Sequence, residues 1–268
     1  MTLPLEGVRI LALTQLGAGP YAMTVLGDLG AEIIKIEDPA TNGDEARRVP
    51  PMATDGDSPY FQALNRNAKS LSLNLRIAEG REVFQRLVEV ADAVYANTRG
   101  DLPAKLGLNY AQLQAHNPRI VCCSLSGFGR TGPRATEPAY DFIVQAMAGF
   151  MSLTGEPDAP PTRCGVSIVD FSGGLMSALG MMVGILRARE TGVGCDVDVS
   201  LLDTAVSMLN YMAASAPTPA RCARWRPIII ASAARMPPEK STTETPLFVG
   251  GASGSPVMLM KPAYACSR

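Results

Sequence analysis

The chain has 268 residues, a formal net charge of −1 and 47% hydrophobic residues. This length is enough to bury the core of one or two domains. The balanced charge offers no electrostatic reason for nucleic acid or an anionic membrane to be a partner. We therefore expect an ordinary globular enzyme with neither of these partners.

Several features indicate a soluble, cytoplasmic protein. The N-terminus, MTLPLEGVRI, lacks the basic segment and the long apolar segment of a secretory signal. The most apolar stretches, FIVQAMAGFM and LMSALGMMVGIL, contain glycine and fall short of the roughly 18 residues of a membrane span, so we expect buried helices. The six cysteines have no C-x-x-C spacing, and the adjacent Cys122 and Cys123 are expected to be buried thiols on opposite faces of one strand.

Short β-rich runs alternate with amphipathic runs up to about residue 215. Residues 41–60 are polar and rich in proline, and we expect them to form a loop that carries contacts. Because strands and helices alternate, the pattern predicts an α/β fold with a Rossmann-like parallel sheet flanked by helices. Strands are expected at residues 8–14, 31–37, 92–98, 119–128 and 195–203, and helices at 19–30, 79–91, 102–116, 141–153, 167–190 and 201–214.

The motif LGAGPYA follows the first expected strand. Its Gly17-x-Gly19-x-x-Ala22 spacing fits the fingerprint of a dinucleotide site, and Glu37 lies where such folds place the carboxylate that binds ribose. Pro20, expected at the first position of the helix, removes one of the backbone N–H groups that hold a pyrophosphate. An NAD(P) site is therefore one interpretation of this loop, and contact with a different ligand is the other.

Several kinds of site are excluded or disfavoured. The only histidine, His116, is expected at a helix end, where it caps carbonyl groups. One histidine rules out a His-rich metal site and disfavours a Ser-His-Asp hydrolase. The sequence has no H-E-x-x-H, G-x-S-x-G or P-loop motif. We therefore predict no metal site, and the carboxylates remain as candidates for the chemistry.

Two aspartates are candidates for catalysis. Asp141 lies where the loop TGPRATEPAY meets a helix, with Gln145 one turn later, and Asp170 precedes a glycine pair in VSIVDFSGG. An aspartate at a helix start is commonly an N-cap. Each residue is therefore either a cap or an active-site group, and Asp170 is expected to line the same cavity as Asp141.

Several long motifs, taken in order, resemble the class III CoA-transferase family, the CaiB/BaiF or formyl-CoA transferase-like group. The resemblance covers about residues 5–215. It implies the large domain of the CaiB/BaiF fold, which begins with a Rossmann-like domain and so accounts for LGAGPYA without a nicotinamide. The motifs are LGAGPYAMTVLGDLGAEIIKIE, NRNAKSLSLNL, LGLNYAQLQAHNPRIVCCSLSGFGRTGP, AYDFIVQAMAGFMSLTGEPDAPPTR and GVSIVDFSGGLMSALGMMVGILRARETGVG.

The resemblance also implies a reaction. CoA is transferred between carboxylic acids through an enzyme-bound aspartyl-CoA thioester, with Asp141 of the YD-x-x-x-Q motif as the nucleophile. The substrates are then an acyl-CoA and a carboxylic acid acceptor, with no permanently bound cofactor and no metal, and the protein is a homodimer. The residues implied to contact CoA are Gln15, Leu16, Gly17, Ala18, Glu37, Asp38, Arg66, Asn67, Lys69, Asn97, Thr98, Arg99 and Lys105.

Two alternatives accompany this interpretation. α-Methylacyl-CoA racemases share the outline of the sequence, but they use a histidine where this chain has Tyr140. An inactive, truncated remnant is the other alternative, because residues 216–268 do not resemble the rest of the family. We expect residues 1–215 to form the large domain and 216–268 to be a poorly ordered tail in place of the linker and small domain.

Overall fold

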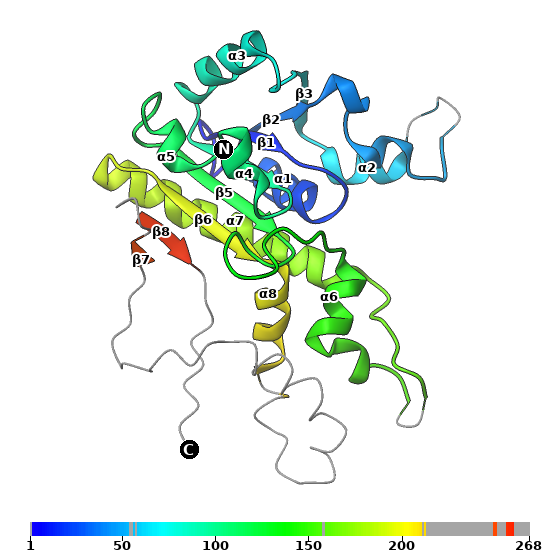
Figure 1. Cartoon of the computed structure of the whole chain (residues 1–268). Helices are drawn as coiled ribbons and strands as arrows, with labels where there is room; N and C mark the ends of the chain where they lie inside the picture. Colours follow the sequence, from blue (N-terminus) through cyan, green and yellow to red (C-terminus); the bar gives the residue numbers. More distant parts are fainter. Residues whose placement is uncertain are drawn as a thin grey trace.

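The computed structural model describes residues 2–53, 56, 58–156, 159–210, 212, 249–250 and 256–259. A single sheet with strand order β3-β2-β1-β4-β5-β6-β8-β7 forms its centre (Figure 1). Strands β1 to β6 are all parallel to their neighbours, β8 pairs parallel with β6, and β7 pairs antiparallel with β8. The strands are β1 (Arg9–Leu13), β2 (Glu32–Glu37), β3 (Ala68–Ser72), β4 (Ala93–Asn97), β5 (Val121–Ser126), β6 (Cys195–Ser200), β7 (Val249–Gly250) and β8 (Pro256–Leu259).

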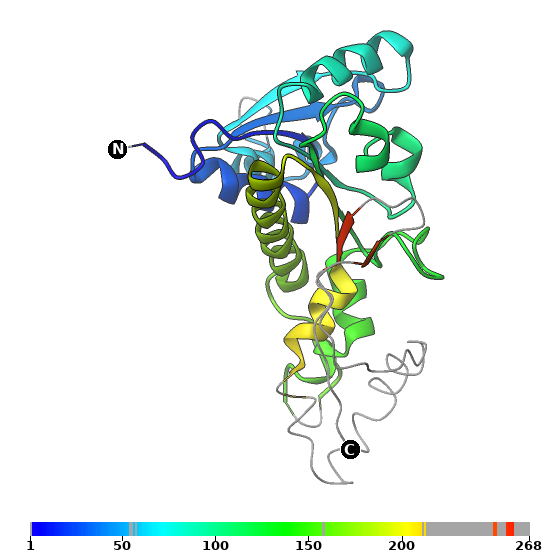
Figure 2. The same ribbon diagram turned by 90° about the vertical axis from the view of Figure 1, so that its left-hand side faces the viewer.

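Helices cover both faces of the sheet, so the core has two halves (Figure 2). One half lies under α1 (Ala18–Asp28), α6 (Asp141–Ala148), α7 (Ile168–Thr191) and α8 (Leu201–Met208). The other lies under α3 (Ala78–Val88), α4 (Leu102–Leu106) and α5 (Tyr110–Leu113). Helix α2 (Pro59–Asn65) contacts α1, and the short 3₁₀ helices are η1 (Pro39–Thr41), η2 (Glu45–Arg48) and η3 (Phe150–Ser152).

The predicted α/β class and parallel sheet are confirmed. Cys122 packs in the half of the core under α3 to α5, and Cys123 packs in the half under α1 and α7, as strand alternation requires. Within the described residues, Cys122, Cys123, Cys164 and Cys195 are all free thiols.

Several elements differ from the predictions, among them α2, which was not expected and begins inside the 41–60 loop. Strand β3 was missed because its sequence, AKSLS, is polar and forms an edge of the described sheet. Helix α1 begins at Ala18, so Pro20 occupies its third position and not the first. The helix expected at 102–116 is split into α4 and α5, because Gly107 adopts a left-handed φ of 75° and ends α4.

The order of the strands reverses between β1 and β4. Strands β2 and β3 lie on one side of this point, and β5 and β6 lie on the other. In such open α/β sheets, ligands bind at the carboxyl ends of the strands beside the point of reversal. Residues 14–17 follow β1 and residues 98–100 follow β4, so the topology predicts that a ligand binds beside these two segments.

Helices α1 and α7 pack closely and both begin at this carboxyl edge. A β-carbon added to Gly174 would lie 2.6 Å from the carbonyl oxygen of Ala18. The rings of Tyr21 and Phe171 meet with their centroids 4.7 Å apart. These contacts place the first turn of α7 beside the first turn of α1.

Helix α7 contains the apolar stretch LMSALGMMVGIL, which was expected to be a buried helix. By length and composition, α7 is the one helix of the described residues that passes the test for a membrane span, with a mean hydropathy of 1.6. Half of that apolar window is buried. Its inner side packs on α1, β5 and β6, which is the position of a core helix.

The predicted tail, 216–268, lies outside the described residues except for β7 and β8. The glycine-rich stretch at 251–254 and the two cysteines at 222 and 266 also lie outside them. The division into a large domain and a tail therefore stays a prediction.

Replacing Gly174 by alanine tests the close packing of α1 and α7. The added methyl group meets a backbone carbonyl that cannot rotate away, and this outweighs the gain in helix propensity of about 1 kcal/mol. We expect Gly174→Ala to lower the free energy of unfolding by roughly 1–3 kcal/mol in urea denaturation. Glu190→Ala, at an exposed position of α7, is the control and should stay within about 0.5 kcal/mol. Equal stabilities for the two variants would contradict the packing described.

Candidate active site

The Asp141 carboxylate caps the start of α7, although the residue itself begins α6. Its Oδ1 accepts hydrogen bonds from the backbone N–H groups of Val169 (2.8 Å) and Asp170 (3.1 Å). Its Oδ2 accepts one from Nε2 of Gln145 at 2.5 Å. Ser167, the residue at the N-cap position of α7, makes no side-chain cap, so Asp141 supplies the negative charge that a helix N-terminus favours.

Asp170 lies in the first turn of α7 and faces the loop after β1. A β-carbon added to Gly17 would lie 3.0 Å from Oδ2 of Asp170 and 3.3 Å from the hydroxyl of Tyr60. Within the described part of the chain, the Asp170 carboxylate accepts no hydrogen bond and forms no ion pair. Burial, and then the charge of Asp141, raise the pKa of Asp170 to about 6.

Tyr60 completes this cluster from α2. Burial, and then the charges of Asp170 and Asp44, raise the pKa of the Tyr60 hydroxyl, so it remains a neutral hydrogen-bond donor. Gly17, Tyr60 and Asp170 come from three separate segments, yet they converge on one point at the carboxyl edge of the sheet. A side chain at position 17 would fill the space in front of the carboxylate.

The loop between β1 and α1 is held from the side of β4. The amide oxygen of Asn97 accepts a hydrogen bond from the Gln15 N–H at 2.8 Å, and its Nδ2 donates one to the Gln15 carbonyl at 2.9 Å. Gly19 has to be glycine because an added β-carbon would overlap the Asn97 side chain. Asn97, predicted to contact CoA, thus has its amide occupied by the loop.

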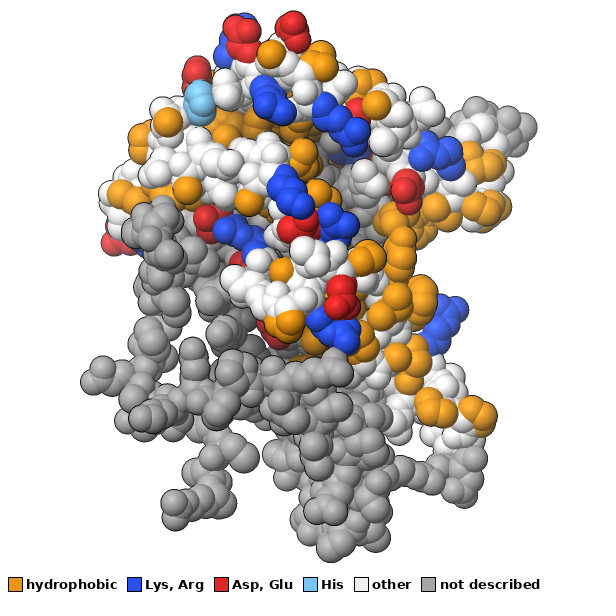
Figure 3. Space-filling model, viewed as in Figure 1, with side chains coloured by type: hydrophobic (Ala, Val, Ile, Leu, Met, Phe, Trp, Pro, Cys, Tyr) orange, Lys and Arg blue, Asp and Glu red, His pale blue; other side chains and the backbone are white. Residues whose placement is uncertain are grey.

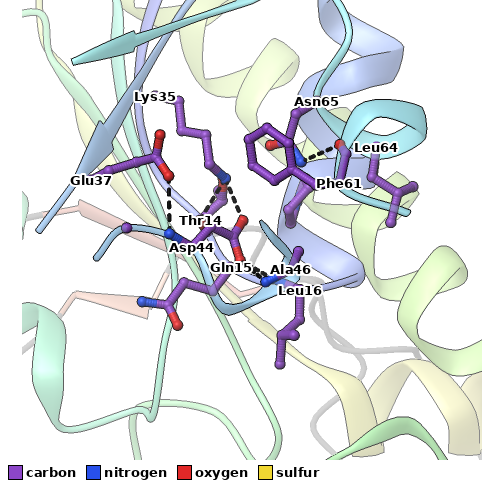
Figure 4. Close-up of polar contacts among 12 residues, drawn as sticks. Thr14, Gln15, Leu16, Lys35, Glu37, Asp44, Ala46, Phe61, Leu64 and Asn65 are labelled. Carbon is purple, nitrogen blue, oxygen red and sulfur yellow. Dashed lines mark hydrogen bonds and ion pairs between the residues drawn. The ribbon is translucent and has the colours of Figure 1, made fainter. Parts of the chain in front are cut away.

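The same loop is held from the side of β2. The Leu16 N–H donates to Oδ1 of Asp44 at 3.1 Å, and Leu16 adopts a left-handed φ of 59° (Figure 4). A branched residue in this conformation is strained by roughly 1 kcal/mol or more, so the surrounding contacts have to impose it. Ala18 is buried at the start of α1.

Glu37 is part of a buried polar network and is not free to meet a ligand. Its carboxylate accepts two hydrogen bonds from Arg47 (2.9 and 2.7 Å), one from the Ser70 hydroxyl and one from the Asp44 N–H. Burial acts to raise its pKa, but the bonds from Arg47, Ser70 and Asp44 outweigh it and lower the pKa to about 2. The prediction that Glu37 contacts CoA therefore conflicts with the structure, because four donors already surround the carboxylate.

The basic residues predicted near β4 lie at the carboxyl edge. Arg99 and Lys105 both pair with Asp101, and their side chains are 39% and 65% exposed. Arg76, which sequence reasoning missed, lies 3.7 Å from Asp38 beyond the end of β3. Thr98 donates only a long hydrogen bond to the Arg99 carbonyl. Figure 3 shows Lys and Arg side chains along the middle of this face with acidic side chains among them.

Arg66, Asn67 and Lys69 lie at the opposite edge of the sheet. Ala68 pairs with Ile33 at the beginning of β2 and β3, so these residues flank the amino ends of the strands. Arg66 and Asn67 bind Asp28 at the end of α1, and Lys69 binds Glu32. Lys69 is the second residue of β3, so three further strand residues, roughly 10 Å, separate it from the carboxyl end of the strand. The structure does not bring Arg66, Asn67 and Lys69 together with the loop at Gly17, and their contact with CoA stays a prediction.

Sequence reasoning missed the residues that shape this site from β2, the 41–60 loop and α2, namely Lys35, Asp44, Arg47 and Tyr60. One signal was present, since a lysine in the middle of the otherwise apolar run IIKI has to find a buried partner. Among the described residues, no cluster of three or more His, Cys, Asp or Glu side chains is suited to a metal ion.

Comparisons with known proteins identify the family of this chain. The family model described as CoA-transferase family III matches residues 5–226, slightly beyond the boundary near residue 215 that the sequence predicted. The chain belongs to this family. The recognition from sequence motifs is confirmed.

Three similar proteins agree with this assignment. The chain is 38% identical over 224 residues to a succinate–glutarate CoA-transferase of Agrobacterium fabrum, covering 80% of this chain and 56% of the relative. It is 41% identical over 229 residues to an acetyl-CoA:oxalate CoA-transferase of Acetobacter aceti, covering 84% and 58%. A CAIB/BAIF family protein from Brucella suis superimposes with a TM-score of 0.75 at 38% identity, covering 82% and 60%. The chain spans little more than half the length of these proteins.

The Glu37 network predicts a pH-dependent stability. The folded-state pKa lies below the ordinary value of 4.5, so the stabilisation is present above about pH 4.5 and is lost as the pH falls toward 2. We expect Glu37→Gln to lower the free energy of unfolding by roughly 2–3 kcal/mol at pH 7, and the difference to shrink below pH 4. Urea denaturation at a series of pH values measures it. Glu82→Gln, exposed on α3, should match the parent at every pH. A Glu37→Gln deficit that is constant from pH 3 to 7 would contradict the network.

Proposed function

We propose that the protein transfers CoA between carboxylic acids and that Asp170 is the nucleophile that carries CoA as an aspartyl-CoA thioester. The observation that supports this most directly is the free, partly buried carboxylate of Asp170 beside Gly17, in a chain that belongs to CoA-transferase family III. Similar proteins are named for succinate, glutarate, oxalate and mesaconate, which are all dicarboxylates. A dicarboxylate is therefore the acceptor class we propose.

The contacts of the two aspartates favour Asp170 over Asp141 as the nucleophile. The oxygens of Asp141 already accept three hydrogen bonds, and moving them would uncap α7. Within the described residues, Asp170 has no such bonds to break. Its pKa of about 6 leaves it mostly ionised at pH 7, while making it more basic and hence more nucleophilic than an ordinary aspartate.

The first half of the reaction then needs only this carboxylate. An Asp170 oxygen attacks the thioester carbonyl carbon of acyl-CoA, the C–S bond breaks, and a mixed anhydride and CoA thiolate form. The thiolate attacks the aspartyl carbonyl, the anhydride C–O bond breaks, and the donor acid leaves as its carboxylate. Asp170 is now an aspartyl-CoA thioester, and no proton has to be transferred.

The second half reverses these steps with the acceptor. The acceptor carboxylate attacks the aspartyl-CoA thioester, which releases CoA thiolate and forms a second mixed anhydride. The thiolate attacks the acyl carbonyl of that anhydride, so the new acyl-CoA leaves and the Asp170 carboxylate is restored. Backbone N–H groups at Gly17 and the first turn of α1 are the proposed donors for the oxyanions.

The remaining features of the proposal concern binding and assembly. Arg99 and Lys105 are the proposed partners of CoA phosphates, because both are exposed and share one carboxylate. The protein is proposed to act in the cytoplasm without a resident cofactor. A homodimer is supported by exposed apolar side chains along one side of α7, at Leu175, Leu179, Val183 and Leu186.

The racemase alternative rests on sequence outline alone. Tyr140, at the position of the racemase histidine, is exposed at the start of α6 and stacks on Phe142. Among the described residues, no contact of this tyrosine favours proton transfer, so the transferase is the function we propose.

Two matched variants test the nucleophile. Purified protein is incubated with succinyl-CoA, and intact mass and hydroxylamine trapping report a CoA adduct or a hydroxamate. Asp170→Asn should abolish both products. Asp141→Asn retains an oxygen that accepts from the α7 amides, so it should keep the adduct with a rate lowered at most about tenfold. The reverse pattern would identify Asp141 as the nucleophile, and a folded parent protein without any adduct would contradict the transferase proposal.

The raised pKa of Asp170 predicts the pH dependence of adduct formation. Attack needs the ionised carboxylate, so the single-turnover rate at saturating succinyl-CoA should rise from pH 5 and level off above a midpoint at about 6. Asp141→Asn removes the neighbouring charge and should move this midpoint downward. A midpoint near 4 in the parent protein would contradict the partly buried site described.

A further inference from the structure

A buried ion pair joins the carboxyl ends of β1 and β2. Lys35 and Asp44 are almost completely buried, with Nζ and Oδ2 2.7 Å apart. The Lys35 ammonium also donates to the carbonyl and the hydroxyl of Thr14, at 2.8 and 3.2 Å (Figure 4). All three of its N–H groups therefore have an acceptor. Register explains the reach, because Lys35 lies opposite Ala12 and Thr14 is two residues further on.

The Asp44 carboxylate distributes its two oxygens between the lysine and the loop. While Oδ2 binds Lys35, Oδ1 accepts from the N–H groups of Leu16 and Ala46 at 3.1 and 2.9 Å. Asp44 is itself held, since its own N–H donates to Glu37. Phe61 of α2 covers the cluster, with its ring centroid 5.7 Å from Nζ of Lys35. The pair is desolvated and fully bonded, which is the arrangement in which a buried ion pair fixes a single geometry.

The bond from Asp44 acts on the residue that sets the position of Gly17. Leu16 has a left-handed φ of 59°, and its strain has to be balanced by a contact that exists only in this conformation. Gly17 follows directly and lies against the Asp170 carboxylate. Asn97 fixes Gln15 independently, so Asp44 is the described side chain that controls the turn itself.

We propose that Asp44, oriented by Lys35, is a positioning residue that sets the Leu16–Gly17 turn at the distance from Asp170 that acyl transfer requires. The inference rests on the proposed function, because it assigns a role in the reaction at Asp170. Asp44 acts through the loop and needs no contact with substrate.

A pair of uncharged double variants separates positioning from stability. Lys35→Met with Asp44→Asn keeps an oxygen that can accept from the Leu16 N–H. Lys35→Met with Asp44→Leu removes that acceptor, and neither double variant leaves a buried charge unpaired. Ser70→Ala, which removes one bond of the neighbouring Glu37 network and does not touch the loop, is the control for general weakening. Circular dichroism and urea denaturation establish that each variant is folded.

The readouts are the amide exchange of Leu16 and the single-turnover rate of adduct formation with succinyl-CoA. In the double variant with Asp44→Leu, we expect the amide hydrogen exchange of Leu16 to become roughly tenfold faster. The single-turnover rate at saturating succinyl-CoA should fall roughly 10- to 100-fold. The succinyl-CoA concentration for half-maximal rate should change less than the rate itself. The Asp44→Asn variant and Ser70→Ala should stay within about threefold of the parent in both readouts.

Two failures are distinguishable. If the parent protein forms no adduct, the proposed function is wrong, and the positioning role of Asp44 is wrong as well. If the parent reacts and the folded Asp44→Leu variant reacts at the same saturating rate, the positioning role alone is overturned. Equal losses in the Asp44→Asn and Asp44→Leu variants would also overturn it, because the acceptor for Leu16 would then be irrelevant.

Discussion

The candidate site depends on how one short peptide, Gln15–Gly17, is held at the end of β1. Two side chains from neighbouring strands or loops bind its backbone, Asn97 on one side and Asp44 on the other. The parallel sheet reverses its strand order at this place, which is where ligands bind in open α/β sheets.

The two aspartates have different roles, since Asp141 caps α7 and Asp170 is the proposed nucleophile. Asp141 accepts hydrogen bonds from Val169, Asp170 and Gln145, and it stabilises the start of α7 as a cap. Asp170, in the first turn of that helix, accepts no hydrogen bond from the described part of the chain, and its pKa is raised by burial and then by the charge of Asp141. The cap thus has a second effect, since its charge makes its neighbour more basic.

The charged residues of the chain also sort by the edge of the sheet on which they lie. Arg99, Lys105 and Arg76 flank the carboxyl ends of the strands, whereas Arg66 and Lys69 flank the amino ends. In the sequence, Lys69 and Arg76 are only seven residues apart. Lys69 is the second residue of β3 and Arg76 follows the end of the strand, so the two side chains lie near opposite edges of the sheet. Proximity in sequence is therefore a poor guide to a site that is built from strand ends.

The sequence by itself determined the class of fold, the order of most elements and the family. These follow from hydrophobic periodicity and from long motifs, which are local properties of the chain. It also singled out Gly17, Asp141 and Asp170 as the residues around which the site is built. Whether Asp141 or Asp170 is the carboxylate occupied by backbone donors was decided only by the tertiary structure, because the two backbone N–H groups that bind Asp141 belong to α7, 28 and 29 residues away in the chain. The ion pair of Lys35 with Asp44 was likewise decided by the tertiary structure, because Asp44 reaches the lysine only when the loop after β2 folds back over the strand. Local patterns specify elements, but hydrogen-bond partners between elements depend on packing and register, and these are set only when the whole sheet has formed.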